Sequence, residues 1–498
     1  MPDDTSGPRP PAHSGEPVPA GKKGDTFVTE DTPRLRLLIP LVVAIAFFME
    51  QLDATIITTA IPDMAHALHT SPVQMNLAVS AYVLTLAVFI PLSGWCADRF
   101  GVRPVFIAAL GFFTTGSALC GAAGSFPELV ATRVLQGLGG AMMTPVGRLI
   151  LLRSFPRAQL VRAMTYATLP AIAGPLIGPL LGGYLTTYLS WRWIFYVNVP
   201  FGFLGVILAY RFLNPSQTPR SPSFDLAGFV LFGAGVGLLE ATFEGAGYVP
   251  PLVLAGMALC AAGLIFAFYR HSRAHLHPLV DLRLLRERAF AVATTAGGLS
   301  RIAMNAPIYL LPLMLQIGLG LTPIQSGGLT FLAALGAPPV RLLVGPALRR
   351  FGFRTMLLGG ALACACALGN LALIGRHTSH ELIAFAIVFF GLARSTQFMT
   401  SNTLAYADVP SERLSRATSL GGLMQQLTVS FGVSLAAALL GLLARNQMVP
   451  ALGAFHAVFY ILALIPLFGF PAFMRLQPQD GAVVSGHAAG SARESGQA

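Results

Sequence analysis

The sequence predicts an all-α polytopic membrane protein built from two related halves. Three observations lead to this prediction. The 498 residues are 54% hydrophobic and only 11% charged, with a mean hydropathy of +0.67. They contain many apolar runs, and one short basic turn occurs twice at distant places. Because a soluble protein carries about 25% charged residues, water is not the main solvent of this chain.

The apolar runs set the number of spans. A transmembrane helix needs about 20 predominantly apolar residues. Fourteen runs meet this need, near residues 37–60, 73–95, 104–124, 129–151, 163–186, 192–212, 225–243, 251–269, 289–316, 325–347, 355–375, 382–401, 417–442 and 453–474. An even number of spans places both ends of the chain on the same side of the membrane.

The repeated turn divides the spans into halves. Its first copy reads Gly94-Trp95-Cys96-Ala97-Asp98-Arg99-Phe100-Gly101-Val102-Arg103, and its second reads Gly345-Pro346-Ala347-Leu348-Arg349-Arg350-Phe351-Gly352-Phe353-Arg354. The copies lie 251 residues apart (345 minus 94) and eight spans apart. Such an internal repeat is typical of a transporter fold made of two bundles. With six spans in each bundle, two extra spans lie between them.

These counts give the expected domain organisation. We expect a disordered tail at 1–33, a six-helix bundle at 34–212, an inserted helix pair at 213–270, a connection at 271–288, a second six-helix bundle at 289–475 and a tail at 476–498. The first tail is rich in Pro, Gly, Asp and Ser, a composition that cannot bury a core. The polar residues 270–289 suggest an interfacial helix lying on anionic lipid.

The net charge of +11 could suggest a nucleic-acid partner, but the positions of the charges exclude this interpretation. Seventeen arginines fall in connections on the side of the tails. Only Arg192, Arg376 and Arg445 fall on the other side. Cytoplasmic loops of membrane proteins carry such an excess, so both termini are expected in the cytoplasm.

The basic turn is a candidate gate. Gly101 permits a tight turn between helices, and Gly94, Gly345 and Gly352 belong to the same repeated loop. In the first copy, Asp98 can bridge neighbouring helix ends with Arg99 and Arg103, and such bridges can break when the bundles rock. In the second copy Arg349 replaces the acid beside Arg350 and Arg354. Any bridge there should therefore be weaker.

Three charged residues within the spans are candidates for moving protons. A buried arginine such as Arg133 is costly and usually functional, although it could also serve structurally by bonding backbone carbonyls. Asp53 lies in the middle of the first span, where an unpaired carboxylate would be protonated. Glu50 lies three residues earlier on the same helical face, so one acid could titrate while the other orients it.

The fifth span carries a pattern of small residues, Gly174-Pro175-Leu176-Ile177-Gly178-Pro179-Leu180-Leu181-Gly182-Gly183. Glycines at positions i, i+4 and i+8 share one helical face and let another helix approach closely. The two prolines each remove a backbone donor and can kink the helix.

The arginines in or near the spans suggest a class of substrate. Arg133, Arg148, Arg301, Arg341 and Arg394 lie in or near spans, against two deep acids. A cavity for lipophilic cations should instead be acidic and aromatic. Because arginine binds carboxylates in bidentate geometry, an organic anion such as citrate is a candidate substrate. Asn305, Gln397, Asn402 and Gln425 could line the same cavity or join helices by hydrogen bonds.

The remaining groups suggest no chemistry. Glu240 and Glu244 are expected at the membrane interface near the outer end of the inserted pair. The five cysteines form no metal-binding pattern, and no nucleophile–base pair indicates an enzyme. No phosphate-binding GxxxxGK[ST] loop occurs, so the proton gradient is the expected energy source and no cofactor is expected.

Several motifs resemble those of the major facilitator superfamily. The basic turn resembles its loop after the second helix, and Arg133-Val134-Leu135-Gln136-Gly137-Leu138-Gly139-Gly140 resembles its fourth-helix motif. The fifth-span pattern resembles the antiporter motif of its exporting members. Leu52-Asp53-Ala54-Thr55-Ile56-Ile57-Thr58-Thr59-Ala60-Ile61-Pro62 and Trp191-Arg192-Trp193-Ile194-Phe195-Tyr196-Val197-Asn198-Val199-Pro200-Phe201-Gly202 resemble signatures of its 14-span drug:proton antiporter family. Phe47-Phe48-Met49-Glu50-Gln51-Leu52-Asp53 and Gly139-Gly140-Ala141-Met142-Met143-Thr144-Pro145-Val146-Gly147-Arg148 resemble its MdtD-like branch.

The resemblance implies a monomeric multidrug-type exporter in a bacterial inner membrane, exchanging a small molecule for protons by alternating access. In that family the arginine matching Arg133 is thought to couple proton movement to substrate movement. Three functions stay open: a proton-coupled exporter, whose substrate could be an organic anion, an importer of the same fold, and a sensor that binds without transport.

Overall fold

The computed structural model describes residues 35–155, 157–213, 224–246, 248–275, 278–280, 282–409, 413–444, 450–477 and 480–485. All regular structure in these ranges is helical, which confirms the predicted all-α fold. The first tail, residues 1–33, lies outside the described residues, as do Arg445 and most of the second tail.

The helices of the first bundle are α1 (Leu35–Ile56), α2 (Ile61–Ala67), α3 (Asn76–Phe89), α4 (Leu92–Phe100), α5 (Val102–Ala122), α6 (Phe126–Ser154), α7 (Arg157–Tyr188), α8 (Trp193–Tyr196) and α9 (Asn198–Phe212). The inserted pair is α10 (Leu226–Glu244) and α11 (Pro251–Ala274). The second bundle contains α12 (Arg288–Asn305), α13 (Pro307–Leu313), α14 (Pro323–Ala334), α15 (Ala337–Leu371), α16 (His380–Ala407), α17 (Leu414–Leu443), α18 (Leu452–Leu464) and α19 (Phe470–Met474), followed by the short α20 (Ala482–Ser485).

The spans agree with the predicted organisation. Twelve helical stretches in the described residues are long and apolar enough to cross a membrane, and the bent pair α3–α4 adds a thirteenth. One of the twelve, Pro323–Leu371, covers two predicted spans in 49 residues. Its backbone turns at Gly352, so it counts as two, and fourteen spans are compatible with the structure.

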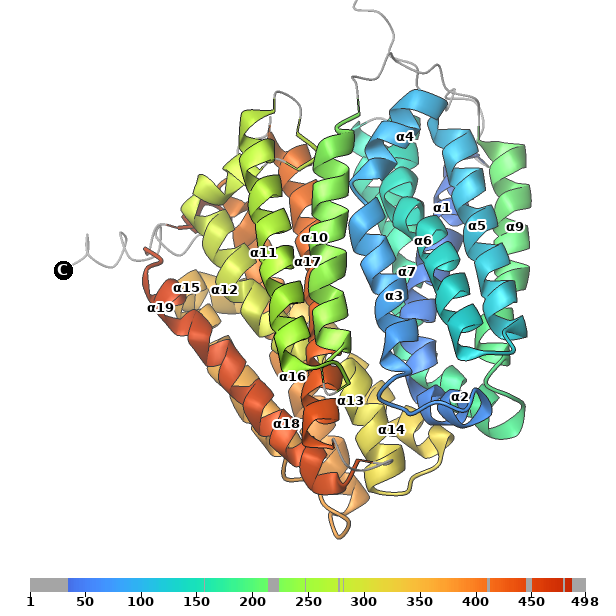
Figure 1. The fold of residues 1–498 in the computed structure, drawn as a ribbon. Coiled ribbons are helices and arrows are strands. Elements are labelled where there is room, and N and C mark those ends of the chain that lie inside the picture. Colours follow the sequence, from blue (N-terminus) through green and yellow to red (C-terminus); the bar gives the residue numbers. More distant parts are fainter. Residues whose placement is uncertain are drawn as a thin grey trace, which may run out of the picture.

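The two bundles lie side by side, and the inserted pair packs along their junction (Figure 1). Helix α10 contacts α3 of the first bundle and α17 of the second, and α3 also contacts α17 directly. Helix α11 packs on α10, and residues such as Leu252 and Leu259 on its other side are exposed. In the described residues, α10 therefore attaches the inserted pair to both bundles.

The repeated turn has the same backbone in both copies. Gly101 ends α4 with φ 91° and ψ 150°, and Gly352 interrupts α15 with φ 70° and ψ 169°. This region of backbone space is open almost only to glycine. The sequence repeat is thus also a structural repeat, and the turn geometry explains why glycine stands at both positions.

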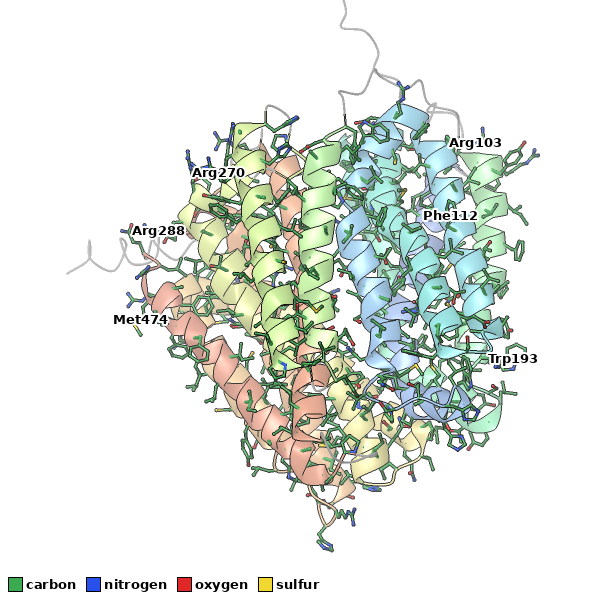
Figure 2. The ribbon with its side chains drawn as sticks, viewed as in Figure 1. Arg103, Phe112, Trp193, Arg270, Arg288 and Met474 are labelled. Carbon is green, nitrogen blue, oxygen red and sulfur yellow. The ribbon has the colours of Figure 1, made fainter. Side chains whose placement is uncertain are left out.

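The two ends of the molecule differ in charge. Arg103 and Arg270 lie toward one end, where α4 meets α5, whereas Trp193 lies at the opposite end near α2 (Figure 2). We call these the arginine-rich end and the arginine-poor end. They correspond to the sides that the arginine count predicts as cytoplasmic and outer.

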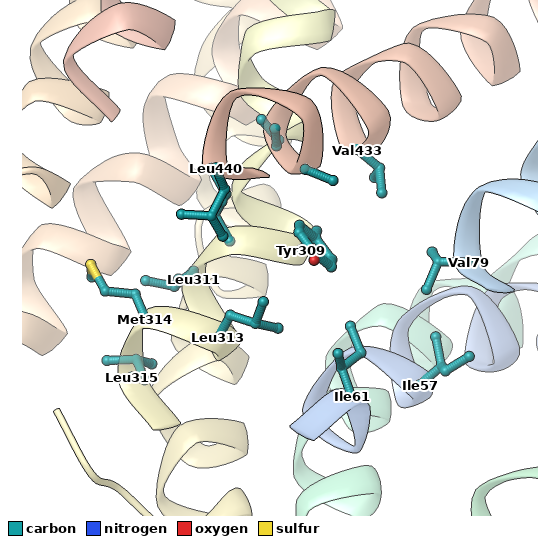
Figure 3. Packing of buried hydrophobic residues seen from close by; sticks show 14 of the residues in the cluster. Ile57, Ile61, Val79, Tyr309, Leu311, Leu313, Met314, Leu315, Val433 and Leu440 are labelled. Atoms are coloured by element: carbon teal, nitrogen blue, oxygen red, sulfur yellow. The ribbon is translucent and has the colours of Figure 1, made fainter. Parts of the chain in front are cut away.

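The bundles meet at the arginine-poor end. Among the described residues, three hydrogen bonds join the two six-helix bundles directly, and all three lie there. They run from Tyr309 Oη to the Pro72 carbonyl (2.9 Å), from Gln316 Nε2 to the Thr59 carbonyl (3.0 Å) and from the Ile324 N–H to Thr187 Oγ1 (3.2 Å). Buried apolar residues of both bundles, including Ile57, Val79 and Val433, pack around Tyr309 (Figure 3). The structure is therefore closed at this end.

One expectation about the connections is wrong. In the described part of 270–289, α11 continues to Ala274, a 3₁₀ turn covers Leu282–Arg286 and α12 begins at Arg288, so no separate interfacial helix lies there. The start of the second tail is ordered. The N–H of Gly481 donates to the carboxylate of Asp408 (3.0 Å), and Asp480 pairs with Arg288 (3.4 Å), which fixes this segment on the second bundle.

The positive φ of the turn glycine gives a stability prediction. Gly101→Ala forces a Cβ into a glycine-only conformation and should cost about 1–3 kcal/mol of unfolding free energy. Gly94→Ala is the matched control, because Gly94 is helical and a Cβ there meets nothing within 4 Å. Thermal unfolding of the purified protein should show a lowered midpoint for Gly101→Ala only. Equal midpoints for the two variants would contradict this account of the turn.

Candidate functional site

A fully buried ion pair lies at the centre of the first bundle. Arg133 on α6 donates from Nη1 to Oδ2 of Asp53 on α1 over 2.7 Å, and both side chains are at most 1% exposed. An isolated charge of either sign would be very costly at this depth. Each residue therefore requires the other, and the pair fixes the relative position of α1 and α6.

Neutral side chains complete the shell around the carboxylate. Gln136, one helical turn after Arg133, donates from Nε2 to Asp53 Oδ1 (2.8 Å) and accepts from Arg133 Nη1 (2.8 Å). Asn198, at the start of α9, lies 3.4 Å from the same Oδ1. Both amides also contact Ser117 Oγ on α5. Four helices thus converge on one carboxylate.

The guanidinium of Arg133 is held from a third helix. Its Nε donates to the Ala78 carbonyl of α3 (3.1 Å), and its Cζ lies 4.2 Å from the ring centroid of Tyr82. Its Nη2 is buried with no hydrogen-bond partner, as is the hydroxyl of Tyr82. Unsatisfied buried polar groups of this kind are rare.

Asp53 is paired in this conformation. Arg133 and Gln136 donate hydrogen bonds to its carboxylate, and the amide of Asn198 lies 3.4 Å from it. Glu50 differs. It is 7% exposed, accepts a hydrogen bond from Thr144 Oγ1 (2.5 Å), and has no ion-pair partner within 4.0 Å among the described residues. Arg148 is its electrostatic neighbour without bonding to it.

The glycines of the fifth span hold α7 against this part of α1. A Cβ on Gly174 would lie 2.8 Å from the backbone nitrogen of Leu52, and one on Gly178 would overlap Thr55. A Cβ on Gly182 would overlap the Ile56 carbonyl. The predicted close approach is present, and its partner is the segment of α1 that carries Asp53. Pro175 and Pro179 lie inside α7, which continues as a single helix of 32 residues.

The same face of α7 reaches the second bundle. A Cβ on Gly183 would lie 2.5 Å from the Pro323 carbonyl of α14, and Gly327 of α14 lies against the Pro179 carbonyl. The motif therefore contacts both the helix of the ion pair and the opposite bundle at the arginine-poor end.

The candidate gating loop forms bridges within its own bundle. Asp98 pairs with Arg153 of α6 (2.8 Å) rather than with Arg99 or Arg103. Arg103 instead donates to the Tyr210 carbonyl of α9 (2.7 Å). In the second copy, the guanidinium of Arg350 lies over the ring of Phe351 (5.5 Å), and no described acid pairs with Arg350 or Arg354.

The candidate cavity residues of the second bundle form two arginine–asparagine pairs. Arg301 of α12 donates to Asn402 of α16 (2.7 Å), and Arg394 of α16 donates to Asn305 of α12 (3.1 Å). Neither arginine forms an ion pair with a described acid. Both positive charges are therefore held by neutral groups.

The two candidate glutamines, Gln397 and Gln425, lie on consecutive helices but make different contacts. Gln397 of α16 is 2% exposed and donates to Ser300 (3.3 Å). Gln425 is a partly exposed residue of α17. The interhelical hydrogen bond of Gln397 fits the structural alternative, whereas Gln425 is only partly buried.

Comparison with known proteins identifies the family. The model of the Major Facilitator Superfamily matches residues 43–433, and again residues 293–494. The chain belongs to the major facilitator superfamily.

Curated relatives agree with this assignment. The chain is 39% identical over 445 residues to a Pectobacterium atrosepticum protein named "Putative multidrug resistance protein MdtD", covering 88% of this chain and 95% of the relative. A Yersinia enterocolitica protein of the same name is 39% identical over 420 residues, covering 84% and 89%.

Solved structures show the shared fold. A bacterial homologue of the lysosomal transporter Spinster, in an inward-facing conformation, matches with a TM-score of 0.62 at 16% identity over 92% of this chain and 99% of that chain. The D-xylose–proton symporter matches with a TM-score of 0.61 at 15% identity, covering 89% and 98%. The human organic anion transporter MFSD10 matches with a TM-score of 0.55 at 16% identity, covering 89% and 100%. The chain is therefore a multi-pass membrane transporter.

The sequence analysis did not identify several residues that contact Asp53 and Arg133. Gln136 follows Arg133 by three residues and so shares its helical face, a signal that could have been used. Asn198 and Ser117 gave no such signal, because only the packing of α5 and α9 brings them to Asp53. Tyr82 and Ala78 likewise gave no signal in the sequence, since their contact with Arg133 depends on how α3 crosses α6.

The placement of Glu240 at the membrane interface is wrong. Glu240 is only 2% exposed and lies between α10 and α17, with Ser430 and Ser434 within hydrogen-bond distance of it. Glu244 is partly buried and contacts Asn76 and Ser80 of α3. Their helix packs into the junction of the bundles, so both acids face protein.

One cluster in the described residues has ligands that a metal ion could use. The ligand atoms of Asp225, His271 and His275 lie within 4.8 Å of one another at the arginine-rich end of the inserted pair. Asp225 already caps α10 through the N–H of Gly228 (2.8 Å) and accepts from His271 Nε2 (2.7 Å) and the N–H of Leu279 (3.2 Å). These bonds give the cluster a structural role as the link between α10 and α11.

This link gives a pH prediction. Burial opposes the ionisation of Asp225, but hydrogen bonds from Gly228, His271 and Leu279 outweigh it and hold the pKa of this carboxyl below its ordinary value. The ionised group therefore stabilises the fold above about pH 4, and this contribution is lost as pH falls through the lowered pKa. Asp225→Ala should lower the unfolding free energy by about 1–2 kcal/mol at pH 7.

The measurement is the thermal midpoint from pH 7 to pH 3. The gap between the native protein and Asp225→Ala should narrow below about pH 4, because the native carboxyl then becomes neutral. Asp225→Asn, which keeps a cap but no charge, is the matched control. A gap that stays constant down to pH 3 would contradict a role for the charge.

Proposed function

We propose that this chain is a proton-coupled exporter that works by alternating access in the bacterial inner membrane, with both termini in the cytoplasm. The observation that carries the proposal is the buried pair of Asp53 and Arg133. A carboxylate and an arginine that stabilise each other at the centre of a bundle form a group whose energy depends strongly on one proton.

We assign the paired arrangement of Asp53 and Arg133 to one state of the proposed transport cycle. With the bundles joined at the arginine-poor end, the arginine-rich end is where substrate from the cytoplasm would arrive. In the proposed cycle, substrate from the cytoplasm displaces a proton from Asp53, which leaves the carboxylate bonded to Arg133 as it is in this structure. When the bundles open outward, a proton from outside neutralises Asp53, weakens its bond to Arg133 and favours the return.

Glu50 is a second acid for the same site. It lies one helical turn from Asp53, it is bonded to a hydroxyl, and no cation bonds to it. A neutral carboxyl suits that environment. We propose that Glu50 keeps a proton while Asp53 is ionised, so the two acids of the first span differ in protonation.

The direction of transport follows from similarity. The glycine–proline pattern in α7 resembles the motif of exporting members, and the curated relatives are named as multidrug resistance proteins. Both favour export over import. We expect protons and a small molecule as partners within the bilayer, a monomeric protein, no cofactor and no enzymatic activity.

Two substrate classes are candidates. Similarity to the relatives supports multidrug-type substrates, which are often lipophilic cations. The contacts of Arg301 and Arg394 support organic anions such as citrate, because both charges are held by asparagines instead of acids. A di- or tricarboxylate could engage both arginines in charge-assisted hydrogen bonds.

Flux in proteoliposomes with an imposed proton gradient tests the proposal. With the proton gradient as the only energy source, the native protein should transport either labelled citrate or a lipophilic cationic dye. The rate of gradient-driven transport should be at least about tenfold lower in Asp53→Asn. A tenfold loss corresponds to removing about 1.4 kcal/mol or more of the free energy that protonation of Asp53 supplies. Transport that is indifferent to the gradient would refute proton coupling, and binding without flux would indicate a sensor.

Charge-removing variants decide between the substrate classes. Arg301→Gln and Arg394→Gln keep a donor for the neighbouring asparagine but lose the positive charge. Citrate transport should fall by about tenfold or more in each, as expected for a lost charge-assisted bond of about 1.5–3 kcal/mol. Arg376→Ala, at an exposed position of the arginine-poor end, is the control. Unchanged citrate transport in both glutamine variants would exclude the anion hypothesis.

A further inference from the structure

Two acidic side chains on α10 lie where all three parts of the molecule meet. Glu240 and Glu244 are one helical turn apart. Oε1 of Glu240 accepts a hydrogen bond from Ser430 Oγ (2.8 Å) and lies 2.5 Å from Ser434 Oγ, both on α17 of the second bundle. Glu244 contacts α3 of the first bundle and also lies 3.1 Å from Ser434.

The hydroxyl of Ser434 restricts the protonation of this pair. It lies within hydrogen-bond distance of Oε1 of both glutamates. A serine hydroxyl has one proton to donate and must accept at its other contacts. If both carboxyls were ionised, one of these two oxygens would face the oxygen of Ser434 with no proton between them. The geometry therefore favours one proton on the pair.

The other contacts indicate which acid holds it. Oε1 of Glu244 has three possible donors, Asn76 Nδ2 (2.5 Å), Ser80 Oγ (2.8 Å) and Ser434 Oγ. Several donors on one oxygen stabilise an ionised carboxylate. Oε2 of Glu240 is buried with no partner, which costs much less for a neutral acid than for an anion. The proton therefore belongs to Glu240, which donates to Ser434, which in turn donates to Glu244.

No described cation compensates the pair. Helices α3 and α17 present only Asn76, Ser80, Ser430 and Ser434 to it. The titratable groups that face it from other elements are the phenols of Tyr309 on α13 and Tyr248 after α10. Neither glutamate takes part in an ion pair among the described residues.

Glu244 also adjoins a cavity. The cavity has a volume of about 240 Å³ and lies at the arginine-poor end between α3, α6, α10 and α17. Gln74 and Tyr248 are its other polar residues, and Phe126, Phe243 and alanines of α17 provide apolar walls. A proton from the outer side can thus reach Glu244 and pass through Ser434 to Glu240.

We propose that Glu240 and Glu244 form a second proton-binding site, loaded from the arginine-poor side and separate from Asp53. One bound proton joins α10 to both bundles while they are closed at this end. Loss of that proton leaves two facing carboxylates and weakens the closed junction. Binding of the proton is independent of the proposed export function, whereas its use in transport rests on that function.

Infrared spectroscopy of the full chain in lipid nanodiscs, without substrate at pH 7, tests the site. A neutral carboxyl has its own C=O stretching band, which an ionised carboxyl lacks. The difference between the native protein and Glu240→Gln should show the loss of one such band, sensitive to D₂O. Glu128→Gln, at an acid that caps the start of α6 near the same end, should show no loss.

A second variant and a salt comparison make the test decisive. Ser434→Ala removes the acceptor of the Glu240 proton and should shift the band without removing any carboxyl. An unchanged carboxyl region in both Glu240→Gln and Ser434→Ala would overturn the proposal. Loss of the native band when sodium chloride replaces choline chloride would overturn it in favour of a sodium site. Asp53→Asn should leave the band intact even if the proposed function fails.

Discussion

The arrangement of the first bundle depends on the buried pair of Asp53 and Arg133. Neither charge is tolerable at that depth without the other, and together they bring α1, α3, α5, α6 and α9 to one point through Ala78, Ser117 and Asn198. In the proposed function, this pair is also the part of the bundle that gains and loses a proton. A change in protonation therefore alters the packing constraint itself, which is what a coupled transporter requires.

Glycine packing transmits this constraint. In a bilayer, apolar side chains gain little from leaving lipid, so helices associate where small residues let backbones approach. Gly174, Gly178 and Gly182 place α7 directly on the Asp53 segment, and Gly183 carries the contact to Pro323 of the other bundle. A shift of α1 must therefore move α7 and with it the junction at the arginine-poor end. The Glu240–Glu244 pair lies at the same junction on its α10 side.

Much of the fold could be predicted because its signals are local. Apolar runs define the spans, and the repeated turn shows the two halves, down to the positive φ of Gly101 and Gly352. The charged residues of the spans could also be found, but their pairing could not. No partner was predicted for Asp53, and Glu240 was expected to be interfacial, because one sequence does not show which helix faces each side chain. The roles assigned to the cavity and gating residues stay predictions.

Proton release on substrate binding tests the central claim most directly. The purified protein in weakly buffered solution would receive saturating substrate, citrate or the cationic dye, while a pH indicator reports released protons. The account predicts release from the native protein and none from Asp53→Asn, provided that the variant still binds substrate. Equal release from both would contradict the claim that Asp53, through Arg133, exchanges its proton for substrate.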